Sequence, residues 1–128
     1  MKQAELHLLR NQASKLGGCW ELDIFALPIS IGEATERPHF PICFLAVEGK
    51  LGLILGANLT EPWLNLSQKR DEVIQILTKA NQLPAEIRIK SHKIQEIIEP
   101  ITSILGIKLQ VASLPVLEQA KADLYEHL

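Results

Sequence analysis

Apolar and polar residues recur along the chain with two different periods, and these periods divide it into helices and strands. Within residues 41–56, two apolar runs are joined by a turn that contains Gly49 and Gly52, a pattern typical of a β-hairpin. Nearly every residue of 42–47 is apolar, so this strand lacks the alternation of a half-exposed sheet. We therefore expect it to be covered on both faces, near the centre of an α/β domain.

The segments before the hairpin predict a helix, a strand and a long connection. A loose apolar stripe over 2–16 ends at Gly17-Gly18 and predicts an N-terminal helix. Residues 19–27 read as a strand, in which Trp20, Leu22 and Ile24 share one face and Glu21, Asp23 and Phe25 share the other. The proline-containing stretch 28–41 has no period and predicts a surface connection or an extended arm.

After the hairpin, helical and strand patterns alternate. Asn65 or Ser67 is suited to cap a helix over 68–81, which Pro84 ends. A strand at 85–90, a helix from 91 or 92 to 105, and a strand at 107–112 then predict a right-handed parallel crossover. Pro100 lies inside the apolar stripe of the second helix and should kink it. A last helix is expected over 116–128.

Length and composition indicate a single ordinary domain. The chain has 128 residues, of which 47% are hydrophobic and 22% charged, with a net charge of −2. We expect one domain over 1–128, made of an N-terminal helix (1–17) and a core (18–128). The charge balance makes nucleic acid an unlikely partner, and no apolar run approaches the ~20 residues that span a bilayer.

The two cysteines and the polar first residues bear on the compartment. No apolar leader pattern begins the sequence, so we expect a cytoplasmic protein. Cys19 and Cys43 are then expected to be reduced thiols on strands. A disulfide between neighbouring strands is the alternative, and two unclustered cysteines are a weak basis for a metal site. No cofactor motif is present.

Apart from the first helix, the order of elements resembles that of ribonuclease H-like proteins. The segment Trp20-Glu21-Leu22-Asp23 is similar to the start of integrase and transposase cores, in which a Trp lies near a catalytic Asp. Later junctions of that class resemble Leu55-Gly56, 82–89 and 105–107, and Glu118 lies roughly where their third carboxylate would stand. This resemblance implies a three-strand antiparallel meander followed by αβαβα, which gives a five-stranded mixed sheet with helices on both faces.

The chain also resembles an uncharacterised bacterial domain. The shared features are the Trp-x-x-Asp start at 20–23, an Arg-Pro-x-x-Pro approach to the hairpin at 37–41, and a Leu-Gly exit at 55–56 followed by Glu61-Pro62. No activity goes with that resemblance, so it implies a fold and leaves the function open.

Asp23 and Glu118 are the candidate catalytic residues. Two-metal phosphoryl transfer needs several carboxylates that converge on ions about 4 Å apart. Where the second carboxylate should stand, after the strand 87–90, the sequence has Ser91-His92 instead. We therefore favour a catalytically inert binding or interaction module with no metal. A divergent metal-dependent nuclease that uses Asp23 and Glu118 is the alternative.

Two further sets of residues are candidates for binding. Lys90, Ser91, His92 and Lys93 lie where a strand meets a helix N-terminus, a place suited to a small anion, although we favour the simpler interpretation that Ser91 or His92 caps the helix with solvated lysines around it. Self-association through an edge strand, or contact with an unknown protein partner, is a second expectation. The candidate contact residues for it are Trp20, Arg37, His39, Phe40 and Trp63.

Overall fold

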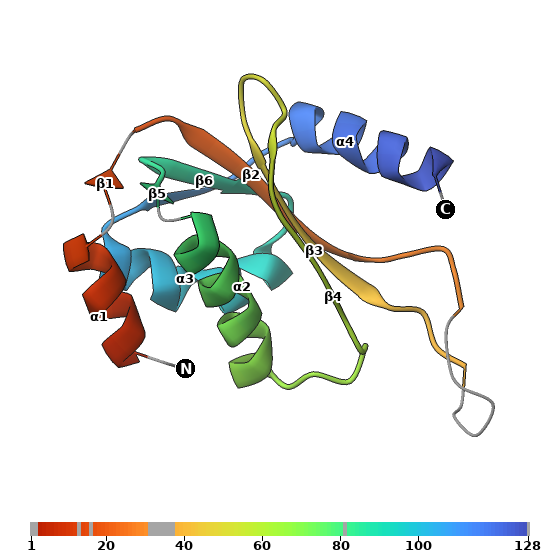
Figure 1. Ribbon diagram of the computed structural model, residues 1–128, viewed down its shortest axis with the longest axis horizontal. Helices are drawn as coiled ribbons and strands as arrows, with labels where there is room; N and C mark the ends of the chain where they lie inside the picture. Colours follow the sequence, from red (N-terminus) through yellow and green to blue (C-terminus); the bar gives the residue numbers. More distant parts are fainter. Residues whose placement is uncertain (1–2, 13, 16, 31–37, 81, 128) are drawn as a thin grey trace.

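The computed structural model describes residues 3–12, 14–15, 17–30, 38–80 and 82–127. Within these residues the chain forms four helices and seven strands (Figure 1). In chain order the elements are α1 (Gln3–Gln12), β1 (Ser14–Lys15), β2 (Cys19–Ala26), β3 (Ile42–Glu48), β4 (Ile54–Thr60), α2 (Leu66–Ala80), β5 (Gln82–Leu83), β6 (Glu86–Ile89), α3 (His92–Leu105), β7 (Lys108–Val111) and α4 (Pro115–Glu126).

Five of the strands form one mixed sheet in the order β4-β3-β2-β6-β7. Strand β3 runs antiparallel to both of its neighbours, β2 and β4, and it forms the predicted hairpin with β4. Strand β6 runs parallel to β2 on one side and to β7 on the other. The predicted five-stranded mixed sheet is therefore confirmed, and β4 and β7 are its two edges.

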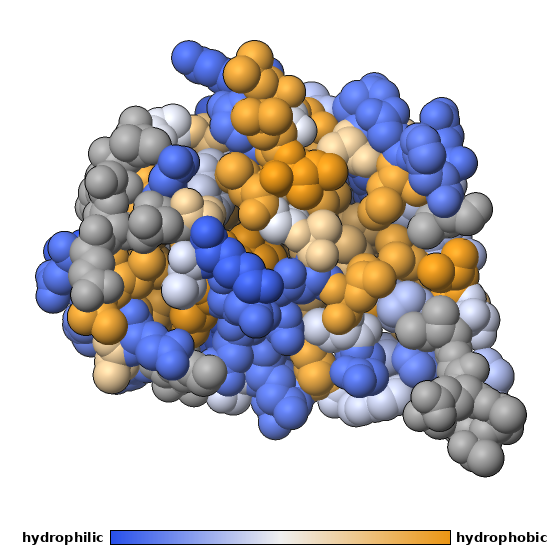
Figure 2. Space-filling view, in the orientation of Figure 1, coloured by the Kyte–Doolittle hydropathy of each residue, from blue (hydrophilic) through white to orange (hydrophobic). Residues whose placement is uncertain are grey.

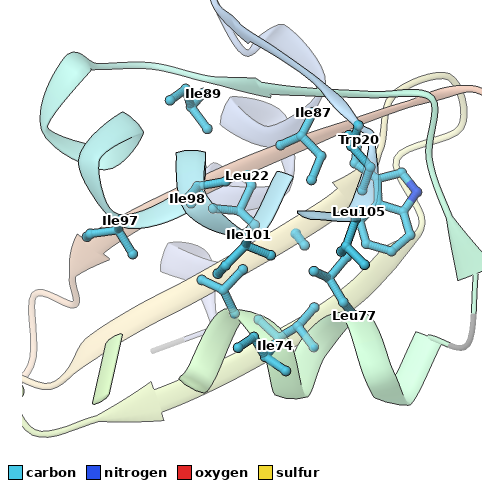
Figure 3. Close-up of a cluster of buried hydrophobic side chains, with 14 of the residues drawn as sticks. Trp20, Leu22, Ile74, Leu77, Ile87, Ile89, Ile97, Ile98, Ile101 and Leu105 are labelled. Carbon is cyan, nitrogen blue, oxygen red and sulfur yellow. The ribbon is translucent and has the colours of Figure 1, made fainter. Parts of the chain in front are cut away.

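Helices cover both faces of the sheet, as predicted (Figure 1). Helices α1, α2 and α3 lie on one face, where their apolar side chains form a buried cluster with Leu22 and Phe44 of the sheet. Helix α4 lies on the other face, where Leu117 packs with Leu45 and Val47. Because successive side chains of a strand point to opposite faces, the apolar run of β3 contributes to both clusters. The larger cluster is drawn in Figure 3.

Both central helices begin at side-chain caps that the sequence favours. The side-chain oxygen of Asn65 accepts from the backbone N–H of Gln68 at 2.8 Å, and the Gln68 side chain accepts from the Asn65 N–H at 2.9 Å. This reciprocal pair is a capping box at the start of α2. Ser91 caps α3 by accepting from the N–H of Ile94 at 3.4 Å. Gly106 ends α3 with a φ of 71°, a conformation that glycine adopts without strain.

Pro100 lies inside α3, which is helical on both sides of it. Proline has no backbone N–H, so the carbonyl of Glu96, four residues earlier, loses its helical donor. The guanidinium of Arg70 on α2 donates to this carbonyl, with Nη2 2.9 Å from the oxygen. Its Nε also donates to the carbonyl of Ile97, at 3.2 Å. Arg70 therefore compensates for the proline and ties α2 to α3.

Strand β4 and helix α2 approach each other closely at Gly56. A Cβ at this position would lie 2.6 Å from Cγ2 of the buried Ile76, so the contact requires glycine. The pairing of β4 with β3 also shifts here, from Ala46 opposite Gly56 to Val47 opposite Ile54. This shift is a β-bulge at Leu55, and it leaves a regular strand only from Gly56 onwards.

The N-terminal region differs from the prediction. Helix α1 ends at Gln12, earlier than the predicted end at Leu16, and Ser14–Lys15 instead forms a short strand. This strand pairs in parallel with Gln82–Leu83 in a separate two-stranded sheet. Strands of two residues are too short to show a period, so the pattern of apolar residues does not reveal them.

Candidate functional site

Asp23 lies on β2, on the face that α4 covers, and only 5% of its surface is exposed. Its Oδ1 accepts from the backbone N–H of the next residue, Ile24, at 2.9 Å. Burial of the carboxyl raises its pKa above the ordinary value of 3.8. The lysines Lys121 and Lys90 act in the opposite direction, whereas the negative charge of Glu118 adds to the rise.

Glu118, the second candidate catalytic acid, is engaged by a lysine. Nζ of Lys90 lies 3.1 Å from Oε1 of Glu118, and this hydrogen bond raises the pKa of Lys90 above its ordinary value. The ammonium group thus stands beside the two acids, where a two-metal centre would need a further oxygen ligand. Across the described ranges no three His, Cys, Asp or Glu side chains are grouped so that they could hold a metal ion.

The four residues 90–93 have different surroundings. Ser91 caps α3, and the ring Nδ1 of His92 lies 2.9 Å from Oε1 of Gln95 on the exposed side of that helix. Lys90, Ser91 and Lys93 line a cavity of about 360 Å³ that also includes Asp23, whereas His92 is not among its lining residues. Asp23 and the lysines after β6 therefore share one cavity, although the sequence suggested them for two different sites.

This arrangement follows from strand pairing. Strands β2 and β6 are parallel neighbours, with Leu22 opposite Ile89. Asp23 and Lys90 each come directly after one of these paired residues, so they lie at the same end of the two strands. The carboxyl ends of parallel strands are a common location for ligands in open α/β sheets. Lys69 of α2 also lines the cavity. The sequence offers no signal for Lys69, because a lysine on the polar side of a helix is usually a solvated residue.

The candidate contact residues are divided between the core and the surface. Trp20 is only 5% exposed and lies in the core cluster (Figure 3), so it is not the contact surface that the sequence suggested. Trp63 is 67% exposed, and its ring contacts that of His39 with centroids 4.9 Å apart. Phe40 is also exposed. Arg37 lies outside the described residues.

Glu21 has a structural role, although the strand pattern predicts only the face of β2 on which it lies. It is 2% exposed, and its Oε1 accepts from the backbone N–H of Leu117 at 2.8 Å. Leu114, at the N-cap of α4, has no side chain that can accept this bond. Glu21 therefore caps α4 from the neighbouring strand. An acid within a largely apolar strand is the signal that could have indicated such a contact.

The two cysteines lie on strands and are free thiols, as expected. Burial raises the pKa of each thiol from 9.0 to about 11. A thiolate is the reactive form of cysteine, and little of it exists near neutral pH at such a pKa. This argues against Cys19 or Cys43 as a nucleophile.

A family model matches residues 5–125, nearly the whole chain; its description is a domain of unknown function, DUF6930. The chain belongs to the DUF6930 family. No curated protein and no solved structure matches this DUF6930 domain. Among its described helices, none is both long and apolar enough to cross a membrane.

The raised pKa of Asp23 predicts that its charge destabilises the DUF6930 domain. A folded-state pKa above the unfolded one favours folding at low pH, and this contribution is lost as the pH rises through the folded-state value. Asp23→Asn keeps an oxygen that can accept from the N–H of Ile24. We expect the variant to melt roughly 2–6 °C higher at pH 7. The gain should shrink as the pH falls through the raised pKa of Asp23, and it should vanish below the ordinary value of 3.8, where the carboxyl is protonated in both the folded and the unfolded wild type.

Thermal unfolding followed by circular dichroism from pH 3 to pH 8 measures this effect. Asp123→Asn is the matched control, because Asp123 lies on the exposed side of α4, where Oδ1 accepts from the Gln119 side chain at 3.2 Å. The control should change the melting temperature little at any pH. A melting temperature of Asp23→Asn below that of the wild type at pH 7 would mean that the folded protein needs the charge.

Proposed function

We propose that this DUF6930 domain is a catalytically inert, ribonuclease H-like interaction module, and that it associates with a second copy of itself through strand β4. The sheet order supports the fold. Its first three strands, β2, β3 and β4, form an antiparallel meander, and β2 also pairs in parallel with the β6–α3–β7 unit that follows. This is the arrangement implied by the resemblance of the sequence to ribonuclease H-like proteins.

The absence of catalysis is supported by the surroundings of Asp23. A metal-dependent nuclease would gather carboxylate oxygens there to bind two cations. Instead, the Lys90 ammonium is paired with Glu118 at 3.1 Å, and the positive charges of Lys90 and Lys121 act on the Asp23 carboxyl. A cation bound there would have to displace these lysines, or its binding would be weakened by repulsion from their positive charges.

The observation that carries the proposal is the open edge of β4. Its seven residues include no charge and no proline. Natural edge strands are usually short, charged, interrupted by proline or covered, because an open edge pairs with other chains. The opposite edge, β7, follows this rule: it has four residues, and its Lys108 Nζ lies 3.5 Å from Glu86 Oε1. Among the described residues, no strand pairs with the outer side of β4.

Apolar side chains lie beside this edge. Helix α4 packs over β3 and β2, and on the same face Ile54 and Leu59 of β4 remain 59% and 58% exposed. At the turn of the hairpin, Leu51 and Leu53 are 82% and 60% exposed. Figure 2 shows hydrophobic residues gathered at this protruding turn. Exposed apolar residues that gather on one part of a surface are typical of interaction sites.

A second copy is the partner that best suits this surface. The edge is uncharged, so another uncharged edge meets it without leaving an unpaired charge in the interface. The net charge of −2 opposes the approach of two copies only weakly. Antiparallel pairing of β4 with β4 also satisfies the two-fold symmetry of most homodimers. The regular part from Gly56 to Thr60, beyond the bulge, provides the backbone groups for it.

Light scattering and sedimentation over a concentration series test this proposal. We expect a species of twice the 14.3 kDa chain mass at high concentration. Leu59→Lys should weaken the dimer by at least about tenfold, because it places a charge in an apolar interface. Leu8→Lys is the control, since Leu8 is 54% exposed on α1, far from β4 in Figure 1. The dissociation constant of the dimer should be the same in this variant as in the wild type.

Three results would overturn the proposal. A strict monomer throughout the series would exclude self-association, and an equal loss of dimer in Leu8→Lys and Leu59→Lys would exclude β4 as the contact. Cleavage of DNA or RNA that depends on Mg²⁺ or Mn²⁺ and is abolished by Asp23→Asn would replace an inert module with the competing proposal, a divergent nuclease that uses Asp23 and Glu118.

A further inference from the structure

The cavity of about 360 Å³ has the composition of a ligand site, and it shares only Thr60 with the β4 segment of the proposed dimer. It lies at the end of the sheet where β2 and β6 end, β3 begins and β4 leads into α2. Its volume is at the lower end of the range for small-molecule pockets in proteins. Any occupant must therefore be small.

One wall of the cavity is apolar. Ile24 and Phe44 contribute to it from the sheet, and Ile94 and Ile97 contribute from the first two turns of α3. These four residues belong to the main core cluster or pack against it. Because the core holds them in place, this wall offers a preformed apolar surface to an aliphatic or aromatic group.

The rim of the cavity carries three lysines from three parts of the chain. Lys69 lies on α2, Lys90 follows β6, and Lys93 lies in the first turn of α3. Lys90 is held by Glu118. Within the described part of the chain, Lys69 and Lys93 make no ion pair. Two ammonium groups therefore remain for an anion, beside the positive end of the α3 dipole.

Two acids also line the cavity, Asp23 and Glu61. Asp23 is buried, with one oxygen bonded to the N–H of Ile24, whereas Glu61 is exposed to solvent. With both acids charged, the three lysines leave the lining with a formal charge of +1, and Lys90 is already paired with Glu118, which lies outside the lining. The balance favours a ligand with a single anionic group over a polyanion.

The two helices that carry the free lysines are fixed relative to each other. Arg70, the residue after Lys69, donates to the carbonyls of Glu96 and Ile97 on α3 at 2.9 and 3.2 Å. Lys69 and Lys93 therefore extend from a braced pair of helices, and little ordering of the backbone opposes binding.

From this cavity, its apolar wall and its two unpaired lysines, we propose that the domain binds a small organic anion that has an apolar body and one acidic head group. The body lies against Ile24, Phe44 and Ile97, and the head group lies between Lys69 and Lys93. Of β4, only its last residue, Thr60, lines the cavity, and the apolar wall and the two lysines lie on other elements, so binding does not require dimer formation.

Phenyl phosphate is a suitable probe, with inorganic phosphate and phenol as its two halves. Calorimetric titration and thermal shift of the full chain should detect binding of phenyl phosphate, and binding at least about tenfold weaker for either half, because each lacks one of the two contacts. Lys69→Gln and Lys93→Gln should each lower the affinity for phenyl phosphate about tenfold. Lys79→Gln, on the same helix as Lys69 but outside the cavity lining, should bind like the wild type.

The result is decisive in either direction. Equal affinity for phosphate and phenyl phosphate would mean that charge alone is recognised, and equal affinity for phenol would mean that the lysines play no part. Either of these results, or the absence of binding by phenyl phosphate, overturns the proposal. So does a loss in Lys79→Gln that equals the loss in Lys93→Gln. Circular dichroism of each variant shows whether it has kept its fold.

Discussion

Replacing Glu21 by alanine should lower the free energy of unfolding by about 2–4 kcal/mol, the range expected when a buried helix cap and its packing are lost together. The Glu21 carboxylate, 2% exposed, accepts from the N–H of Leu117 at 2.8 Å. Leu114 at the N-cap cannot take over, so the variant leaves this N–H unsatisfied beneath α4. A loss of this size is a large part of the stability of an ordinary domain.

Urea denaturation followed by circular dichroism measures the loss. Glu21→Gln keeps a side-chain oxygen at the same number of bonds from the backbone. We therefore expect it to lose at most half of the free energy of unfolding that Glu21→Ala loses. Glu118→Ala, in the first turn of the same helix but with its side chain 42% exposed, is the control and should cost less than about 1 kcal/mol. A Glu21→Ala midpoint equal to that of the wild type would show that this contact does not hold α4.

Replacing Arg70 by alanine should cost about 1–3 kcal/mol, because its charged side chain donates to two carbonyls of α3. The cost should depend on Pro100. In the Pro100→Ala background, the new N–H at position 100 can donate to the carbonyl of Glu96, which then needs Arg70 less. The same Arg70→Ala change should therefore cost at least about 0.5 kcal/mol less in that background.

A double-mutant cycle with urea denaturation of the four proteins measures this coupling. Lys79→Ala, also on α2, is the control residue; its cost should be the same with proline or alanine at position 100. A cost of Arg70→Ala that is independent of residue 100 would mean that the arginine acts only through the Ile97 carbonyl or by packing. Pro100 would then be tolerated for another reason.

The same pair shows what the sequence can and cannot predict. The apolar period predicts α3 on both sides of Pro100, and the proline itself predicts a disturbance there. The compensating donor is an arginine 26 residues from the Glu96 that it contacts, on another helix. No local pattern connects the two residues, since their contact depends on how α2 and α3 pack.

The candidate site was predictable in its parts but not in its assembly. Asp23 and Lys90–Lys93 stand out in the sequence as the ends of strands, where polar residues follow apolar ones. Their shared cavity depends on the parallel pairing of β2 with β6, which joins residues 19–22 to residues 86–89. Lys69 completes the cavity from a helix surface where lysine is ordinary, so only the tertiary structure distinguishes it.

The contact between Glu21 and Leu117 also bears on how the chain folds during synthesis. The two residues are 96 positions apart, so α4 cannot receive its cap until nearly all of the domain has left the ribosome. Until then, one face of the central strands, including Cys43, Leu45 and Val47, has no helix to cover it. The nascent domain therefore carries an open apolar sheet face through most of its translation, and it closes this face only when residues 115–126 emerge.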